Sequence, residues 1–350
     1  MSIQKINKMK RTSSRLLFAC LAVAGVYLAS WLYLTFIQSP CTIKETASVY
    51  VYPGESQDVV IEKLIEAGKI KHPRKLKSLL NYMKYKDNVH VGRYDLKPGM
   101  SNYKIAKNLR AGLQTPVKLT FNNMRTVENL AGRLDKQLMM DSTEILTCFK
   151  ESTWRDSLKL TPENYMCIFI PNTYDVYWNT TPEKLRNLLI REYKNFWDET
   201  RTAEAEKIGL TKAEVSTLAS IVEEETNKKD EMPKVAGLYL NRLRIDMPLQ
   251  ADPTVKFAVG DFSIKRILTE HTRISSPYNT YRNIGLPPGP IRIPSITAID
   301  AVLMATRHSY IYMCAKDDFS GYHAFATTYS QHMANAAAYH QALNKSGIMQ

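Results

Sequence analysis

The 350-residue sequence has few cysteines and few glycines, and each shortage excludes a class of protein. Its five cysteines form no CxxC pair, which excludes zinc ribbons and thioredoxin-like redox sites. Cys148 and Cys167 could form a disulfide in an oxidising compartment, but we favour free buried thiols. With 14 glycines and 16 prolines, the chain is neither collagen-like nor of low complexity.

Short motifs of several enzyme classes are also absent. The sequence contains no HExxH, P-loop, GxGxxG or GxSxG motif. Its seven histidines show no metal-ligand spacing, so we expect no metal and no cofactor. Acids are fewer than bases, and the net charge is +13. A protein with this charge could bind nucleic acid, anionic lipid or an anionic polymer such as a cell wall, and the charge alone does not distinguish among these ligands.

A long uncharged stretch follows the basic N-terminal residues 1–15. Residues 16–37 carry no charge, and at about 1.5 Å per residue they can cross a hydrocarbon core of roughly 30 Å. Trp31, Tyr33 and Phe36 lie near its far end, as interfacial aromatic residues do. We therefore predict a transmembrane helix at 16–37, with the basic tail in the cytoplasm and the rest of the chain outside. This topology disfavours a nucleic-acid binder.

A cleaved signal peptide is the alternative for this stretch. Its apolar core would be shorter, and small residues would mark the cleavage site. Ala29 and Ser30 are small, but the bulky run WLYL follows them. The uncleaved anchor is therefore the interpretation we favour.

Residues 45–117 are predicted to form a small module of strands and helices. Ser48–Tyr52 alternates valine and tyrosine, as strands do. An apolar stripe between Val59 and Ile65 predicts a helix that Gly68 ends. The tetrapeptide PGES at 53–56 recurs 45 residues later as PGMS. This weak internal repeat fits a βα repeat module.

A basic stretch lies between the two copies of the repeat. Its positive residues are Lys69, Lys71, Arg74, Lys75, Lys77, Lys84 and Lys86. Tyr82 and Tyr85 are interleaved with them. One interpretation is a surface that binds sugar or phosphate polymers, with rings stacking on the ligand. We favour the other interpretation, a solvated helix face beside an anionic membrane.

The remainder, residues 118–345, is predicted to be a larger unit of mixed helices and strands. A strand is expected to open it at Val117–Phe121, and a buried strand at 311–315. The other expected elements are helices at 126–138, 141–152 and 181–198 and an aromatic loop at 169–178. The predicted fold class is therefore α+β.

A helix that begins at the capping box Thr211–Glu214 carries an acid on its apolar face. Its apolar stripe consists of Val215, Leu218, Ala219 and Val222. The same spacing continues to Glu225, whereas Glu223 and Glu224 point elsewhere. Burial should raise the pKa of Glu225, and a carboxylic acid that is protonated near neutral pH can act as a glycosidase general acid. The alternative is a helix-end glutamate that merely borders the core.

Downstream loops carry amides, hydroxyls and rings between prolines. They are Met247–Thr254, Ser276–Tyr281 and Gly285–Ile291. Such groups bind sugar hydroxyls well, although ordinary turn chemistry explains them too. His323 lies near a predicted strand entry, where a lone histidine is more often structural.

Six segments resemble, in order, the motifs of the MltG (YceG-like) endolytic murein transglycosylases. They are LASIVEEET at 218–226, NRL at 241–243, MPLQADPT at 247–254, YNTY at 278–281, GLPPGPI at 285–291 and GYHAF at 321–325. The resemblance implies cleavage of the β-1,4 bond between N-acetylmuramic acid and N-acetylglucosamine within glycan strands. It implies a 1,6-anhydro-muramyl end and no water nucleophile.

The same resemblance implies an organisation and a location. Residues 45–117 would be a LysM-like module, and 118–345 the YceG-like catalytic domain. The protein would lie in the bacterial inner membrane with its catalytic domain on the periplasmic side. Its partners would be peptidoglycan glycan strands and, by analogy, membrane-bound peptidoglycan synthases.

The family motifs also imply roles for single residues. Glu225 matches the catalytic glutamate, the second of an E-x-E pair of which Glu223 is the first. The further candidates for binding the sugar are Gln250, Asn279, Tyr281 and His323. The sequence departs from the family pattern at Asn172, Phe257 and Lys316, where an acid, a tyrosine and an acid are common. The change at Asn172 puts in doubt a role for that acid in tuning the catalytic pKa.

Two other functions remain as alternatives. A hydrolytic muramidase would need a second carboxylate near Glu225, with Glu223 and Asp252 as candidates. A non-catalytic peptidoglycan-binding scaffold would bind glycan without needing Glu225.

Overall fold

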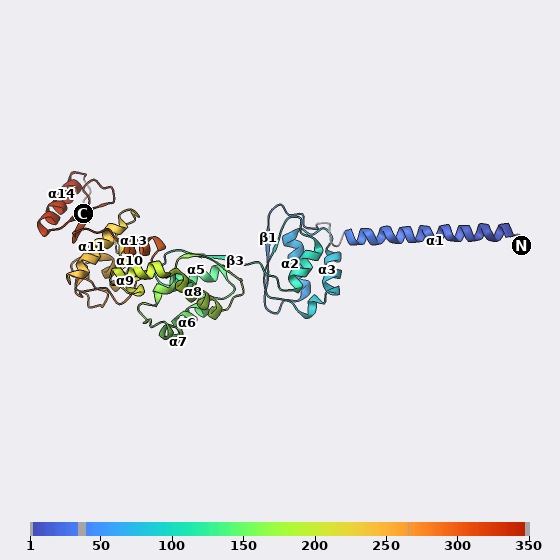
Figure 1. Cartoon of the computed structure of the whole chain (residues 1–350), viewed down its shortest axis with the longest axis horizontal. Coiled ribbons are helices and arrows are strands. Elements are labelled where there is room, and N and C mark those ends of the chain that lie inside the picture. Colours follow the sequence, from blue (N-terminus) through green and yellow to red (C-terminus); the bar gives the residue numbers. More distant parts are fainter. Residues whose placement is uncertain (1–2, 34–39, 265, 347–350) are drawn as a thin grey trace. The chain divides into compact units, whose positions relative to one another are not determined.

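The computed structural model of the chain describes residues 3–33, 40–264 and 266–346 (Figure 1). They belong to two compact units, one of residues 1–117 with 175–179 and one of residues 118–174 with 180–350. In the described part, the strands form three two-stranded sheets, and helices make up most of the rest. The chain is therefore a mixed α+β protein.

The first helix, α1 (Ile3–Leu32), joins the basic tail and the apolar stretch into one element (Figure 1). The predicted transmembrane stretch starts within this helix, at residue 16. Its window Arg15–Leu32 has a mean hydropathy of 1.8 and is long and apolar enough to cross a membrane, a test that a signal sequence also passes. The side chains of residues 15–33 are exposed, so α1 adds nothing to a protein core. Phe36 and the predicted end at residue 37 lie outside the described residues.

Between residues 40 and 117, the described part of the first unit has two strands and three α-helices, besides a short 3-10 helix at Tyr85–Asp87. They are β1 (Ala47–Val51), α2 (Gln57–Gly68), α3 (Pro73–Tyr82), β2 (Gly92–Leu96) and α4 (Asn102–Arg110). The strands pair antiparallel from Ala47 opposite Leu96 to Val51 opposite Gly92. Leu64, Leu76 and Leu109 are among the buried residues that form one core under this sheet. The unit thus has a hydrophobic core of its own.

The sequence repeat is a structural repeat of helix starts. Gly54 and Gly99 both have φ of +79°, which glycine tolerates in a turn. Ser56 then caps α2, and Ser101 caps α4, each by accepting a hydrogen bond from the backbone N–H three residues on. The repeated PGxS segment therefore encodes a turn followed by a capped helix.

Gly68 ends α2 differently from our prediction. It is the last helical residue, and Lys69 takes the left-handed conformation with φ of +46°. A Cβ built on Gly68 would lie 2.8 Å from Cδ1 of Leu96. The glycine is thus required by close packing against β2 rather than by its own φ.

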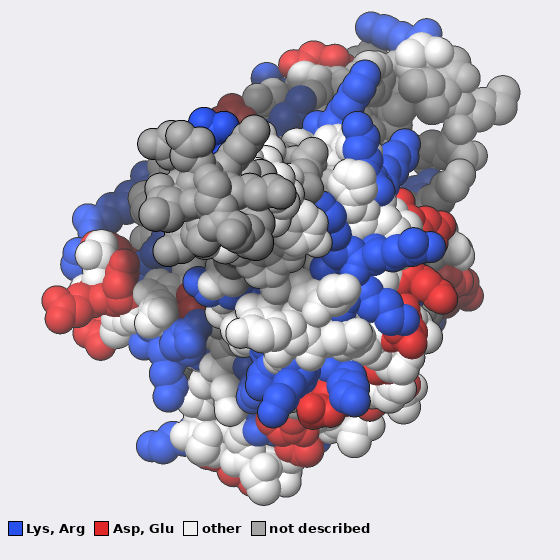
Figure 2. Space-filling model, turned by 90° about the vertical axis from the view of Figure 1, so that its right-hand side faces the viewer, with Lys and Arg blue, Asp and Glu red and all other residues white. Residues whose placement is uncertain are grey.

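The basic stretch begins at Lys69, just after α2, and continues along α3 and past its end. This helix lies toward the right-hand side of its unit in Figure 1, and the view from that side shows many lysine and arginine side chains together with some acids (Figure 2). Lys77 pairs with Asp58 at 2.8 Å. Tyr82 is 86% exposed, whereas Tyr85 is fully buried in the core. Of the two interleaved rings, Tyr82 alone is therefore placed to contact a ligand or a membrane.

Strand β3 (Val117–Phe121) pairs with β4 (Asn172–Val176), and residues 118–121 and 172–174 of the pair belong to the second unit. Its first helices are α5 (Val127–Leu134), α6 (Ser142–Lys150), α7 (Ser152–Ser157), α8 (Pro182–Phe196) and α9 (Glu199–Lys207). The prediction that 169–178 is entirely loop was wrong, because β4 lies within it. Tyr174 and Val176 are buried and the residues between and before them exposed, which is the period of a strand. Cys148 and Cys167 are buried and free.

The helices that position the site follow in the chain. They are α10 (Lys212–Glu225), α11 (Met232–Arg244), α12 (Asp252–Val259) and α13 (Ile296–Leu303). Helix α10 packs against the other three. Nine consecutive residues of α10, 215–223, are buried, so this helix is the centre of the unit.

A hairpin and a helix complete the described chain (Figure 1). Strand β5 (Tyr312–Ala315) pairs antiparallel with β6 (His323–Ala326), and α14 (Tyr329–Lys345) packs on both. We had predicted a buried strand at 311–315. Every residue of β5 is instead half-buried, because a two-stranded hairpin covered by one helix cannot enclose it.

Candidate active site

Glu225 is the last residue of α10. The helix begins with the predicted capping box, in which Thr211 and Glu214 exchange hydrogen bonds between side chain and backbone. It ends where Thr226 turns to an extended conformation with φ of −142°. A helix C-terminus carries partial negative charge, so this position disfavours an ionised carboxylate.

A cavity of about 240 Å³ opens beside Glu225. Its lining comes from α10, α11, the start of α12, the loop around residue 281 and the hairpin β5–β6. The polar residues that line it are Glu225, Tyr239, Arg242, Gln250, Asp252, Tyr281 and His323. Segments about 100 residues apart in the sequence therefore converge on the carboxyl of Glu225.

The pKa of Glu225 is raised from 4.5 to about 7. Burial is the main cause, and the negative charge of Asp252 adds to it. A hydrogen bond of 2.7 Å from the Tyr239 hydroxyl to Oε1 of Glu225 opposes the rise, as does the charge of Arg242. The balance keeps a large fraction of Glu225 protonated near neutral pH.

Two further groups are held in place around this carboxyl. The Arg242 guanidinium donates to the carbonyls of Ile311 and Leu249, and its burial lowers its pKa. The Tyr281 hydroxyl donates to Asp252, which together with burial raises the pKa of Tyr281. Both groups are thereby fixed before any substrate arrives.

Four of the six predicted site residues share this cavity: Glu225, Gln250, Tyr281 and His323. Gln250 reaches it with φ of +48°, and its N–H donates to the carbonyl of Thr280. Asn279 does not line it. Its buried side chain donates to two backbone carbonyls and accepts from the N–H of Tyr281, so it holds the loop in shape.

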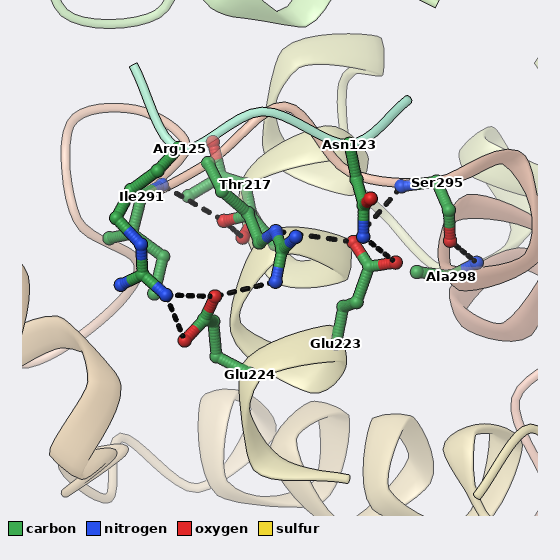
Figure 3. A network of polar contacts seen from close by, with 10 residues as sticks. Asn123, Arg125, Thr217, Glu223, Glu224, Ile291, Ser295 and Ala298 are labelled. Carbon is green, nitrogen blue, oxygen red and sulfur yellow. Dashed lines mark hydrogen bonds and ion pairs between the residues drawn. The ribbon is translucent and has the colours of Figure 1, made fainter. Parts of the chain in front are cut away.

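Glu223 also lies away from the Glu225 cavity, in a separate polar network (Figure 3). It accepts hydrogen bonds from Asn123 at 3.1 Å and from the N–H of Ser295 at 3.0 Å, and it pairs with Arg292. Glu224 pairs with Arg292 and Arg125 in the same network. Figure 3 shows these side chains converging from α10 and from neighbouring loops.

A second cavity of about 290 Å³ adjoins the first. Glu225 and Asp252 line both, and Lys256 and Arg266 line the second. Glu225 therefore has open space on two sides. This arrangement suits a polymer that passes the carboxyl more than a small molecule that ends at it.

Tyr239, Arg242 and Glu231 are site residues that we did not identify from the sequence. Tyr239 and Arg242 are polar groups on the buried face of α11, which is the same signal that identified Glu225. Glu231 lies in the turn before α11, where no periodic pattern marks it. Among the residues that the structure describes, no group of three His, Cys, Asp or Glu side chains could hold a metal ion.

Comparison with known proteins shows what this chain is similar to. An endolytic murein transglycosylase of Bacillus subtilis is 28% identical over 311 residues, which cover 83% of each protein. One of Streptococcus pneumoniae is 29% identical over 93% of this chain, but the match spans 64% of that relative's length. The crystal structure of a yceG-like protein from Listeria monocytogenes shares the fold, with a TM-score of 0.55 and 23% identity over 83% of this chain and 99% of that one. A sequence model of the YceG-like family matches residues 49–338, and the chain therefore belongs to this family.

Proposed function

We propose that this protein is an endolytic peptidoglycan lytic transglycosylase. It would cleave the β-1,4 bond between N-acetylmuramic acid and N-acetylglucosamine inside glycan strands and so limit the length of nascent strands. The observation that carries the proposal is the carboxyl of Glu225, whose pKa of about 7 leaves it able to donate a proton beside a cleft open on two sides. The names of the relatives agree with this activity.

The chemistry follows from one acid. Protonated Glu225 donates to the glycosidic oxygen while positive charge develops at the muramyl C1. The C6 hydroxyl of the same sugar closes on C1, and Glu225, now a carboxylate, takes its proton. Attack within one sugar has a high effective molarity, which offsets the lack of a water nucleophile held by a second carboxylate.

A hydrolytic muramidase is the second candidate, because Asp252 lines the same cavities as Glu225. Glu223, the other candidate for a second carboxylate, lies in a different cavity and does not support it. Asp252 lies at the start of α12 and accepts a hydrogen bond from the hydroxyl of Tyr281. Products with reducing ends would be its signature.

We further propose that α1 anchors the chain in the bacterial inner membrane, with its N-terminus inside and the catalytic unit on the periplasmic side. Residues 45–117 would act as a LysM-like module that binds or positions glycan. Association with membrane-bound peptidoglycan synthases would bring nascent strands to the cleft. The length and apolar composition of α1 support the anchor.

The test is mass spectrometry of purified glycan strands digested by the full-length protein in detergent micelles. We expect 1,6-anhydro-muramyl ends from the parent and none from Glu225→Gln. Glu206→Gln is the matched control, because it makes the same change on the exposed surface of α9. Reducing ends would establish the muramidase, and retained glycan binding without any cleavage would establish the scaffold.

A further inference from the structure

His323 is held in the Glu225 cavity by a buried carboxylate from another element. Its ring Nδ1 lies 2.9 Å from Oε2 of Glu231, and its backbone N–H donates to Oε1 of Glu231 at 2.7 Å. Thr226, the residue after Glu225, donates its hydroxyl to the same Oε2 at 2.9 Å. One carboxylate therefore ties the end of α10 to the first residue of β6.

These contacts define which nitrogen of His323 carries a proton. The side chain of Glu231 is 4% exposed, and three groups point hydrogen-bonding atoms at its two oxygens. The hydroxyl and the backbone N–H are donors, and a carboxylate that accepts them has acceptor sites for the ring as well. Nδ1 must then donate, and Nε2 of the neutral ring is left as an acceptor.

Nε2 of His323 differs from the other polar groups of the cavity, because those already take part in hydrogen bonds. The hydroxyls of Tyr239 and Tyr281 already donate to Glu225 and Asp252, and Arg242 donates to backbone carbonyls. The ring of His323 lines the cavity and its side chain keeps 16% exposure, while no hydrogen bond of the described residues involves Nε2. A substrate hydroxyl can thus donate to it without displacing an existing bond.

We infer that Glu231 is a positioning residue, which fixes His323 so that Nε2 accepts a hydrogen bond from a sugar hydroxyl beside Glu225. The inference rests on the proposed function, since the C6 hydroxyl is the group that this reaction must hold against C1. Orientation of that hydroxyl acts on the chemical step more than on binding.

The kinetic test compares Glu231→Gln and His323→Gln with the parent on glycan strands. Both variants should lower kcat by roughly 10- to 100-fold and change KM by less than about threefold, as the loss of a supporting partner does elsewhere. Glu231→Asp should restore part of the loss. Asp230→Asn is the matched control, because it removes the same charge one residue away, where the carboxylate accepts the hydroxyl of Tyr322. A kcat of Glu231→Gln within threefold of the parent would overturn the inference.

A second measurement does not depend on activity. Nitrogen NMR of the full-length protein with labelled histidine reports the protonated ring nitrogen, and His323→Gln assigns the signal. We expect Nδ1 protonated in the parent and in Asp230→Asn, a mixture of tautomers in Glu231→Gln, and a shift of the Nε2 signal when N-acetylglucosamine oligomers are added. A parent protonated at Nε2 would contradict the inference. An inactive parent with the expected tautomer would overturn the proposed function and leave the arrangement standing.

Discussion

Three consecutive glutamates of α10 show how surroundings decide the chemistry of a side chain. Glu223 and Glu224 are buried or half-buried, and their oxygens contact arginines, an amide and a backbone N–H. Glu225 meets one hydroxyl donor and a neighbouring carboxylate at the negative end of the helix. The same residue type therefore serves as a structural link and as a candidate acid within one helical turn.

The raised pKa of Glu225 predicts a pH-dependent stability. Below pH 4.5 the carboxyl is protonated in folded and unfolded chains alike. Between pH 4.5 and about 7 the unfolded chain releases the proton and the folded chain retains it, so the stabilisation is lost as pH rises and levels off above 7. The loss is at most about 3 kcal/mol. Urea unfolding of the parent should show this decline relative to Glu225→Gln, and parallel curves for the two proteins would contradict it.

The hydroxyl of Tyr239 predicts a shift in the activity profile. It donates to Oε1 of Glu225 and so favours the charged form. Tyr239→Phe removes that donor without changing the packing, and the pKa of Glu225 should rise further. The alkaline limb of the pH–rate curve should therefore move to higher pH, by about one pH unit. Tyr193→Phe, which alters a buried tyrosine hydroxyl on α8 beside Cys167, should leave the limb in place. An unmoved or lowered limb in Tyr239→Phe would refute this role.

At the scale of elements, the network of Figure 3 fixes the C-terminal end of α10. Arg292 pairs with both Glu223 and Glu224, and all three side chains are at most 16% exposed. Arg292→Met should cost about 3–5 kcal/mol in the free energy of unfolding, because it leaves buried carboxylates with fewer partners. Arg191→Met, which breaks the exposed pair with Glu192, should cost less than about 1 kcal/mol. Urea denaturation measures the free energy of unfolding of both variants. Equal decreases in the two would show that the network does not stabilise the fold.

The sequence predicted an element well where neighbouring residues alone determine it. The capping box at Thr211 and the two PGxS segments mark helix starts through bonds three residues apart, so the sequence is sufficient. Strand β4 was missed because its partner β3 lies about 50 residues away and supplies the hydrogen bonds. The sequence also did not show why a glycine is needed at position 68, because the side chain that leaves no room for a Cβ there is Leu96, on the distant strand β2.

At the scale of the whole molecule, the sequence predicted those site residues that carry a signal of their own, either helical periodicity or a family motif. Glu225 stands out by helical periodicity, and motif resemblance added Gln250, Tyr281 and His323. The side chains that hydrogen-bond to site residues could not be predicted, because they are distant in the sequence. Glu231 is 92 positions from His323, and Asn123 is 100 positions from Glu223. Asn279 is buried and bonded to the backbone of its loop, and a motif does not distinguish such an amide from one that binds sugar.

The basic stretch after α2 predicts attraction to an anionic membrane. Lys71 and Arg74 are exposed, and Tyr82, which lines a cavity together with Arg74, is 86% exposed. The proposed anchor α1 belongs to the same unit, so we expect these basic side chains near lipid headgroups, where each contributes about 1 kcal/mol. A chain of residues 40–350 keeps the core of the first unit, because α1 is exposed. It should bind vesicles containing phosphatidylglycerol and not neutral ones.

The double variant Lys71→Glu, Arg74→Glu should weaken this binding at least tenfold, and raised salt should weaken binding of the parent chain. Lys136→Glu, Lys159→Glu makes the same charge change at exposed positions of the second unit and should have a smaller effect. Cosedimentation with vesicles measures both. Equal binding to neutral vesicles would contradict the prediction. Retention by purified glycan strands that is lost in the first double variant would instead assign the basic stretch to the polymer, with Tyr82 as the stacking ring.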